Sequence, residues 1–146
     1  MKHSPFPDTP TRPLRPVERA FVTMVRQWRA GADGQQIVWN DLAVRLGPAR
    51  ALETLLQLID THGWRALDIL DPDAPAFSAD EADLARLVMM ATEQDRESAL
   101  AEACFVVRPA VLLQLLIAAE RVGLPLLCAD CRARVAGQTG FFDRPP

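Results

Sequence analysis

The sequence predicts a single all-α domain, a compact bundle of about six or seven helices with disordered ends. Apolar residues recur at spacings of three and four along most of the 146 residues, and glycines and prolines fall where helices would end or begin. No two alternating segments flank a hairpin turn. With 49% hydrophobic and 24% charged residues, the chain has the composition of one ordinary globular domain. Its apolar runs are shorter than the roughly 20 residues of a membrane-spanning helix, so no membrane partner is expected.

Residues 1–15 are expected to form a disordered, proline-rich arm, and the helical domain begins after it. Five prolines within residues 1–16 exclude a regular helix there. No apolar run typical of a secretory signal is present, so we expect a cytoplasmic protein. Pro16 suits the first position of a helix that ends between residues 31 and 34. The apolar face of this helix comprises Val17, Phe21, Met24, Val25 and Trp28.

Two more helices are expected before residue 64. The first would bury Val38, Leu42 and Leu46 and end at Gly47. The second begins at Pro48 and ends near His62. Its apolar face comprises Leu52, Leu55, Leu56 and Ile59. Residues 64–75 predict a turn or a short strand followed by a loop, because aspartate and proline alternate at their end.

A capping box predicts the start of the next helix, because Ser78 stands three residues before Glu81. This helix has an apolar face of Leu84, Leu87, Val88 and Ala91. A break at residues 92–95 separates it from a fifth helix. The buried face of the fifth helix is expected to comprise Leu100, Ala103, Cys104 and Val107.

The most apolar helix is expected at residues 111–119. It is apolar nearly all round, as is typical of a central helix of a bundle or of an oligomer interface, and we assign Leu112 and Leu116 to a self-association interface. Gly123 and Pro125 predict the end of this helix. Residues 126–135 then predict one more short helix, so the helical domain spans residues 16–135 and residues 136–146 form a flexible tail.

The charges are distributed unevenly around a formal net charge of −3. Residues 1–50 carry eight basic and four acidic side chains, residues 51–103 carry three and twelve, and residues 104–146 carry five and three. An acidic middle between basic ends suggests a charge-steered partner or an antiparallel self-association, although solvated helix faces give the same pattern.

The most specific chemical motif is the CxxC at Cys128 and Cys131. Two thiolates at this spacing can bind Zn²⁺ or exchange with a disulfide. A closed zinc site needs four ligands, and the others available are Cys104, His62 and His3 or two thiolates of a second subunit. A helix over residues 126–135 would place both cysteines among leucines, where small cysteines pack. Packing is therefore the favoured interpretation, and a metal or redox site is the alternative.

Residues 39–58 allow a degenerate helix-turn-helix with Gly47 at the turn. Pro48 and Glu53 depart from the pattern, and Arg45 and Arg50 would contact DNA. A DNA-associated regulator is therefore kept beside the interpretation as an ordinary helical corner. An enzyme is not expected, because neither histidine has a nucleophile near it in sequence and no glycine loop is present to bind phosphate.

Several short motifs carry a family likeness. These are Asp80-Glu81, Asp95-Arg96-Glu97 and Val107-Arg108-Pro109, with weaker contributions from residues 34–39 and from Leu46-Gly47. Through them the chain resembles small uncharacterised all-helical proteins of alphaproteobacteria of the Rhodobacter type. The resemblance implies a bacterial helical domain and supplies no catalytic residue, and the CxxC has no counterpart in it.

The sequence therefore predicts a non-catalytic interaction or regulatory protein without a cofactor, whose partner is another protein or a second copy. The expected state is a homodimer held through Leu112 and Leu116. The alternatives are a DNA-associated regulator that uses Arg45 and Arg50, and a thiol-based zinc or redox sensor that uses Cys128 and Cys131.

Overall fold

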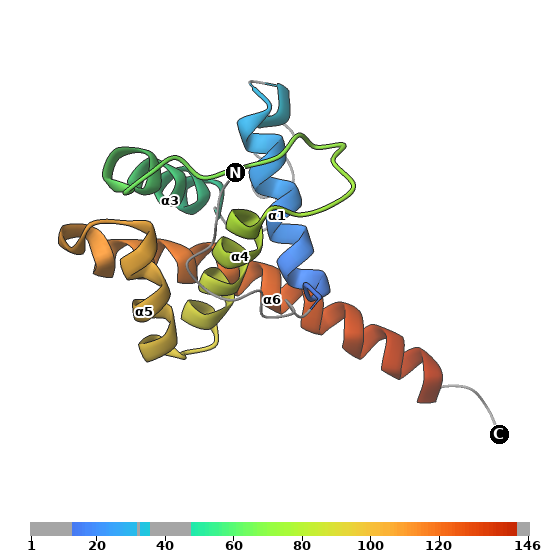
Figure 1. Cartoon of the computed structure of the whole chain (residues 1–146). Helices are drawn as coiled ribbons and strands as arrows, with labels where there is room; N and C mark the ends of the chain where they lie inside the picture. The colour runs from blue at the N-terminus through green and yellow to red at the C-terminus, as the bar shows by residue number, and fades with distance from the viewer. Residues whose placement is uncertain (1–12, 32, 36–47, 143–146) are drawn as a thin grey trace.

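The structure, a computed structural model, is all-α, as the sequence predicts. It describes residues 13–31, 33–35 and 48–142. The helices of the described chain are α1 (Pro16–Arg29), α3 (Pro48–His62), α4 (Ala79–Thr92), α5 (Arg96–Val106), a short 3₁₀ turn η1 (Pro109–Val111) and α6 (Leu112–Phe142) (Figure 1). The helix expected over residues 38–46 and residues 1–12 of the expected arm lie outside the described residues.

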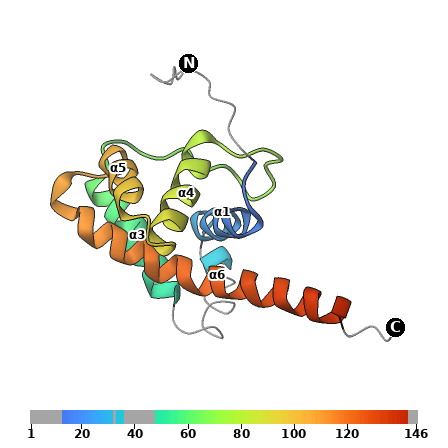
Figure 2. The ribbon, with the colours of Figure 1, turned by 90° about the horizontal axis from the view of Figure 1, so that it is seen from below.

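Helix α6 is the longest element and runs the length of the molecule. Its first half lies beside α3, α4 and α5, and its last turns extend past α1 and away from the other helices (Figure 2). The core between them is aliphatic and includes fully buried side chains from four helices. These are Phe21 and Val22 of α1, Leu52 and Leu55 of α3, Leu84 and Leu87 of α4, and Leu115, Ala119 and Val122 of α6.

The start of the helical domain lies earlier than expected. Within the segment predicted as a disordered arm, Leu14 packs against the core and the side chain of Arg15 forms an ion pair with Glu93 at 2.5 Å. Glu18 accepts a hydrogen bond from the backbone N–H of Arg15 at 2.7 Å. These contacts satisfy polar groups at the first turn of α1, so residues 13–15 belong to the folded domain.

The helix boundaries around α4 follow the predicted capping. Ser78 Oγ accepts from the N–H of Glu81 at 3.1 Å, and Glu81 accepts from the N–H of Ser78 at 2.9 Å, which completes the capping box. Gln94 has φ of 65°, a left-handed conformation that stops α4. Asp95 then caps α5 by accepting from the N–H of Ser98. The predicted break at residues 92–95 is therefore confirmed.

The predicted end of a helix at Gly123 and Pro125 is wrong, because α6 continues through both residues to Phe142. A Cβ at position 123 would lie 1.9 Å from Thr92 Oγ1, so this glycine permits close approach of α4 and α6 and does not act as a cap. Val122 and Leu126 are buried on either side of Pro125 and hold the helix to the domain there. The short helix expected over residues 126–135 and the first seven residues of the expected tail are thus parts of α6.

The buried face of α5 also differs from the prediction. Ala99, Ala103 and Val107 are fully buried, whereas Leu100 and Cys104 are exposed. The small residues four apart let α5 pack closely against α4 and α6, and the larger side chains then point outward. Residues 64–75 contain no strand; the neighbouring Gly63 forms a single bridge with Val107.

One helical stretch of the described chain, Pro109–Gly137, is long and apolar enough to cross a membrane. This differs from the expectation based on uninterrupted apolar runs. The finding is weak evidence for a membrane span, because the core helix of a soluble protein passes the same test. Here, Leu115, Ala119 and Val122 of this stretch are part of the core.

Candidate functional site

A buried ion pair fastens the loop of residues 64–78 to α1 and α4. Arg26 of α1 donates to both carboxylate oxygens of Glu81 at 2.6 and 2.8 Å, and the two side chains are only 6% and 1% exposed. The same guanidinium donates to the carbonyl oxygens of Ala74 and Ala76. Glu81 also accepts from the backbone N–H of Leu70 at 3.2 Å. All of these partners lie within the chain, so the pair is structural.

The electrostatics of Glu81 agree with this role. Burial raises the pKa of its carboxyl group, but the hydrogen bonds from Arg26 and from the backbone of Ser78 and Leu70 outweigh burial and lower the pKa below its ordinary value. A second pair lies beside it, where Arg65 donates to both oxygens of Asp80 at 2.8 and 2.5 Å. Asp80 in turn accepts from the N–H of Asp68. Both carboxylates thus have their hydrogen-bonding partners within the chain.

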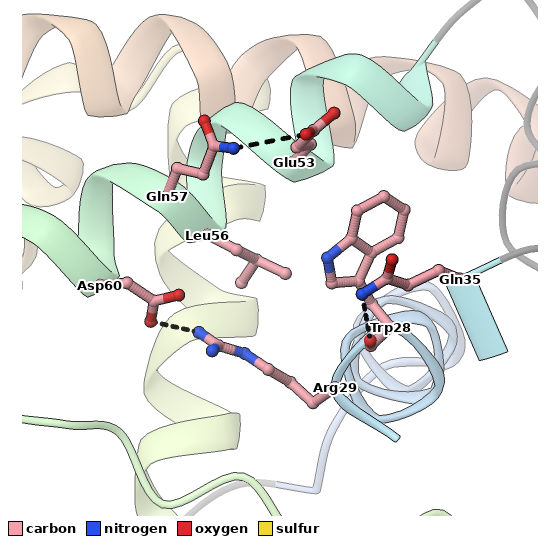
Figure 3. A pocket seen from close by; sticks show the side chains of 7 residues that line it. All are labelled: Trp28, Arg29, Gln35, Glu53, Leu56, Gln57 and Asp60. Carbon is pink, nitrogen blue, oxygen red and sulfur yellow. Dashed lines mark hydrogen bonds and ion pairs between the residues drawn. The ribbon is translucent and has the colours of Figure 1, made fainter. Parts of the chain in front are cut away.

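A hollow of about 370 Å³ lies between α1 and α3 and is lined by polar side chains (Figure 3). Its charged groups have partners within the hollow. Arg29 reaches Asp60 at 2.6 Å, and the amide of Gln57 donates to Glu53 at 3.3 Å. The indole of Trp28 forms part of the wall. Among the described lining residues, no hydroxyl or thiol nucleophile stands beside a base.

A row of exposed apolar side chains runs along α6. It comprises Leu113, Ile117, Leu124, Cys128, Cys131 and Val135, and we call it the α6 stripe. The four aliphatic members are 69%, 52%, 51% and 59% exposed in that order, and both cysteines are exposed. Their spacings of 4, 7, 4, 3 and 4 residues place them within about 60° around the helix. Glu120 and Arg121 lie beside this line between Ile117 and Leu124, so the stripe has an inner pair, Leu113 and Ile117, and an uninterrupted outer run from Leu124 to Val135.

The end of α6 is unsupported by the rest of the described chain. Every residue from 131 to 137 is exposed, and the helix there extends beyond the neighbouring helices (Figures 1 and 2). Isolated helices shorter than about 12–15 residues are marginal in water. A projecting helix end with an apolar line along it is the arrangement expected of a contact face for another helix.

The structure bears on two predictions at this helix. Cys128 and Cys131 are exposed, so their interpretation as buried packing residues is wrong. The reason is that the side of α6 that faces the described helices here carries Leu126 and Asp130, whereas both cysteines lie on the opposite side, which no described helix covers. Leu112 and Leu116, which the sequence assigned to an oligomer interface, are half-buried and pack against the core, so part of each side chain faces its own domain. The exposed face lies one residue further along, at Leu113 and Ile117.

The remaining candidate residues do not meet at one place. Arg50 is exposed at the start of α3, whereas Arg45 and His3 lie outside the described residues. The carbonyl of Cys104 accepts from the indole N–H of Trp64 at 2.9 Å, and the carbonyl of His62 accepts from the N–H of Arg108 at 3.0 Å. Within the described residues, no three metal-binding side chains cluster, so one chain offers the two cysteines of the CxxC and no third ligand beside them.

Comparison with known proteins found no match: no family model, no curated protein and no solved structure matches the chain. Fold and surface therefore define the class on their own. The chain is a small all-α protein whose longest helix is buried at one end and exposes an apolar line at the other.

Sequence reasoning missed Leu113, Ile117, Leu124 and Val135 as site residues. The signal was present as the regular spacing of apolar residues across Gly123 and Pro125. It was obscured because the glycine and the proline predict a helix end at the middle of the stripe.

Proposed function

We propose that this protein is a non-catalytic helical interaction protein that works as a homodimer, with the α6 stripe as the contact face. The observation that carries the proposal is the run of exposed apolar side chains on a helix end that the rest of the described chain leaves uncovered. Helices with apolar residues at alternating spacings of three and four pair side by side, and each buries the apolar line of the other. The final members of the stripe, from Leu124 to Val135, follow this spacing without interruption.

Charge supports a second copy, in antiparallel orientation, as the occupant. Residues 79–106, which include α4 and α5, carry seven acidic and two basic side chains. Three of the acidic ones are paired with Arg15, Arg26 and Arg65 from other parts of the chain, so an excess of two negative charges is left for a partner. The projecting residues 131–142 carry Arg132 and Arg134 and no acidic side chain. An antiparallel pair brings this basic end toward the acidic half of the partner, whereas a parallel pair sets two basic ends side by side. Opposite charges favour the first arrangement.

The test is the mass of the wild-type protein in solution beside two variants of the projecting end. We expect a dimer for the wild type by analytical ultracentrifugation under reducing conditions. Val135→Glu places a charge in the stripe and is expected to give a monomer with an unchanged circular dichroism spectrum. Ala133→Glu is the matched control, because it adds the same charge to an exposed position on the opposite side of α6 and should leave the dimer intact.

Two results would contradict the proposal. A wild-type protein that is monomeric at about 100 μM has no self-association in the usual range of cellular interactions. A monomer that floats with phosphatidylcholine vesicles, and loses this property in Val135→Glu, would assign the stripe to a lipid surface instead.

A further inference from the structure

We propose that the homodimer forms a zinc site in which Cys128 and Cys131 of both copies supply the four ligands. This inference rests on the proposed function, because the site is incomplete without the second chain. Both thiols are exposed in the single chain and stand near the middle of the uninterrupted part of the stripe, between Leu124 and Val135. They are therefore central to the face that the dimer would bury.

The spacing of the stripe is complementary to itself in the antiparallel orientation. When Leu124 lies level with the partner's Val135, Cys128 lies level with the partner's Cys131. The same alignment holds in reverse on the other side of the two-fold axis, which passes between positions 129 and 130. Aliphatic side chains thus meet aliphatic side chains at both ends, and four thiols meet in the centre. No other described thiol is near this centre, since Cys104 lies on α5.

The dimensions suit a tetrahedral metal ion. Two cysteines three residues apart on a helix are displaced by about 4.5 Å along its axis. Packed helices have axes about 8–10 Å apart, so side chains that point at one another from the two helices meet midway. A Zn²⁺ ion with Zn–S distances of about 2.3 Å needs neighbouring sulfurs about 3.8 Å apart. Small rotations of the four thiolates reach this separation.

Zinc is the metal that this donor set favours. Four thiolates in tetrahedral geometry are typical of structural zinc sites, and soft sulfur ligands disfavour magnesium and calcium. Binding requires that each thiol loses its proton, and the bound ion stabilises the four thiolates. Arg132 and Arg134, next to the thiols in sequence, add positive charge that partly offsets the net negative charge of the occupied site, and Arg134 also pairs with Asp130 at 3.2 Å.

The experiment is titration of the reduced, metal-free full chain with Zn²⁺, followed by native mass spectrometry. We expect one Zn²⁺ for every two chains. Cys128→Ser and Cys131→Ser should each abolish stoichiometric zinc, because each removes two of the four ligands. Cys104→Ser is the matched control and should keep it. Val135→Glu should lose both the dimer and the metal.

The outcomes separate this inference from the proposed function. A wild-type dimer that holds no stoichiometric zinc overturns the zinc site and leaves the dimer in place. One ion bound to each monomer also overturns it, since the ligands then come from a single chain. A monomeric wild type overturns both proposals.

The register of the two helices has its own test in a Cys104→Ser background. Cys128→Ser retains Cys131 alone, and Cys131→Ser retains Cys128 alone. In a mixture of the two variants, glutathione disulfide should oxidise Cys128 of one chain and the partner's Cys131 to an intermolecular disulfide, with release of two glutathione thiols. Either variant alone should cross-link far less, because its thiols are displaced along the axis. Equal cross-linking of the variants alone would overturn the pairing on which the site is built.

Discussion

The loop of residues 64–78 and the outer half of α6 differ in whether their buried and exposed side chains have partners. At the loop of residues 64–78, a buried arginine and a buried glutamate find all their partners inside the chain. Along the outer half of α6, aliphatic side chains and two thiols face solvent without a partner. Buried charge is tolerated only where it is paired, and exposed apolar side chains in a row are a feature of contact faces. The first region therefore holds the fold together, and the second is available to another chain.

The largest expected effect comes from breaking the buried pair. Glu81→Gln keeps the shape of the side chain but leaves Arg26 as an uncompensated charge in a nearly solvent-free site. Removal of one partner of a buried ion pair costs about 3–5 kcal/mol. We expect a loss of this size in the free energy of unfolding, measured by urea denaturation.

The matched control for that substitution is Glu93→Gln. Glu93 pairs with Arg15, also across α1, but both side chains are partly exposed to water. Pairs of this kind contribute about 0.2–1 kcal/mol. Equal losses from Glu81→Gln and Glu93→Gln would show that the loop is not held by the buried charge.

A smaller change in stability, opposite in sign at two positions of α6, is expected from adding one methyl group. Gly123→Ala places a Cβ against Thr92 where the helices touch, and overpacking of this kind costs about 1–3 kcal/mol. Gly137→Ala meets nothing within 4 Å. It should strengthen the outer helix locally by about 0.5–1 kcal/mol, because alanine favours helix over glycine. Urea denaturation measures the first change, and amide hydrogen exchange of residues 131–142 measures the second.

These two variants test the continuous helix directly. If α6 ended at Gly123, as a capping glycine predicts, alanine there would remove a left-handed cap and would not meet Thr92. If residues 131–142 were not helical, alanine at position 137 would leave their exchange rates unchanged. Either result would contradict the division of α6 into a packed half and a projecting half.

The sequence predicted the fold class, most helix boundaries and the capping box, because these depend on local features. Ser78 and Glu81 are three residues apart, and the apolar face of α3 repeats within fifteen residues. Local geometry alone decides such features. The same reasoning failed at Gly123, where the deciding neighbour is Thr92, a residue 31 positions earlier that no local pattern connects to it.

The candidate site was predicted in part for a related reason. The sequence identified the CxxC and predicted self-association through the apolar helix, which stays a prediction, and it assigned the contact to Leu112 and Leu116 and not to the exposed Leu113 and Ile117. A helix that is apolar nearly all round does not reveal which side faces its own domain. That choice depends on where α3 and α4 lie, and it determines that Leu115 is buried while Leu113 is exposed.

The smallest expected effect comes from lowering the pH, which weakens the buried ion pair at the loop of residues 64–78 and not the α6 stripe. The pKa of Glu81 is lowered in the folded protein, so its contribution to stability is complete above about pH 4.5 and is lost as the pH falls below this value toward the folded pKa. Glu102 on α5 acts in the opposite sense. Burial raises its pKa, and the charge of Asp83 adds to the shift, so protonation of Glu102 relieves a penalty as the pH falls toward about 4.5.

The free energy of unfolding should therefore rise slightly from pH 7 to about pH 5 and then fall more steeply below pH 4.5, because Glu81 is the more deeply buried group. Urea denaturation across this range measures the profile. Glu102→Gln should reduce the shallow rise, with a remainder from Asp83, whose pKa burial also raises. Glu81→Gln should flatten the fall by removing the carboxylate whose protonation contributes to it. A fall that is equally steep in Glu81→Gln would place the acid-sensitive contact elsewhere and would remove the loop of residues 64–78 from its part in holding the domain together.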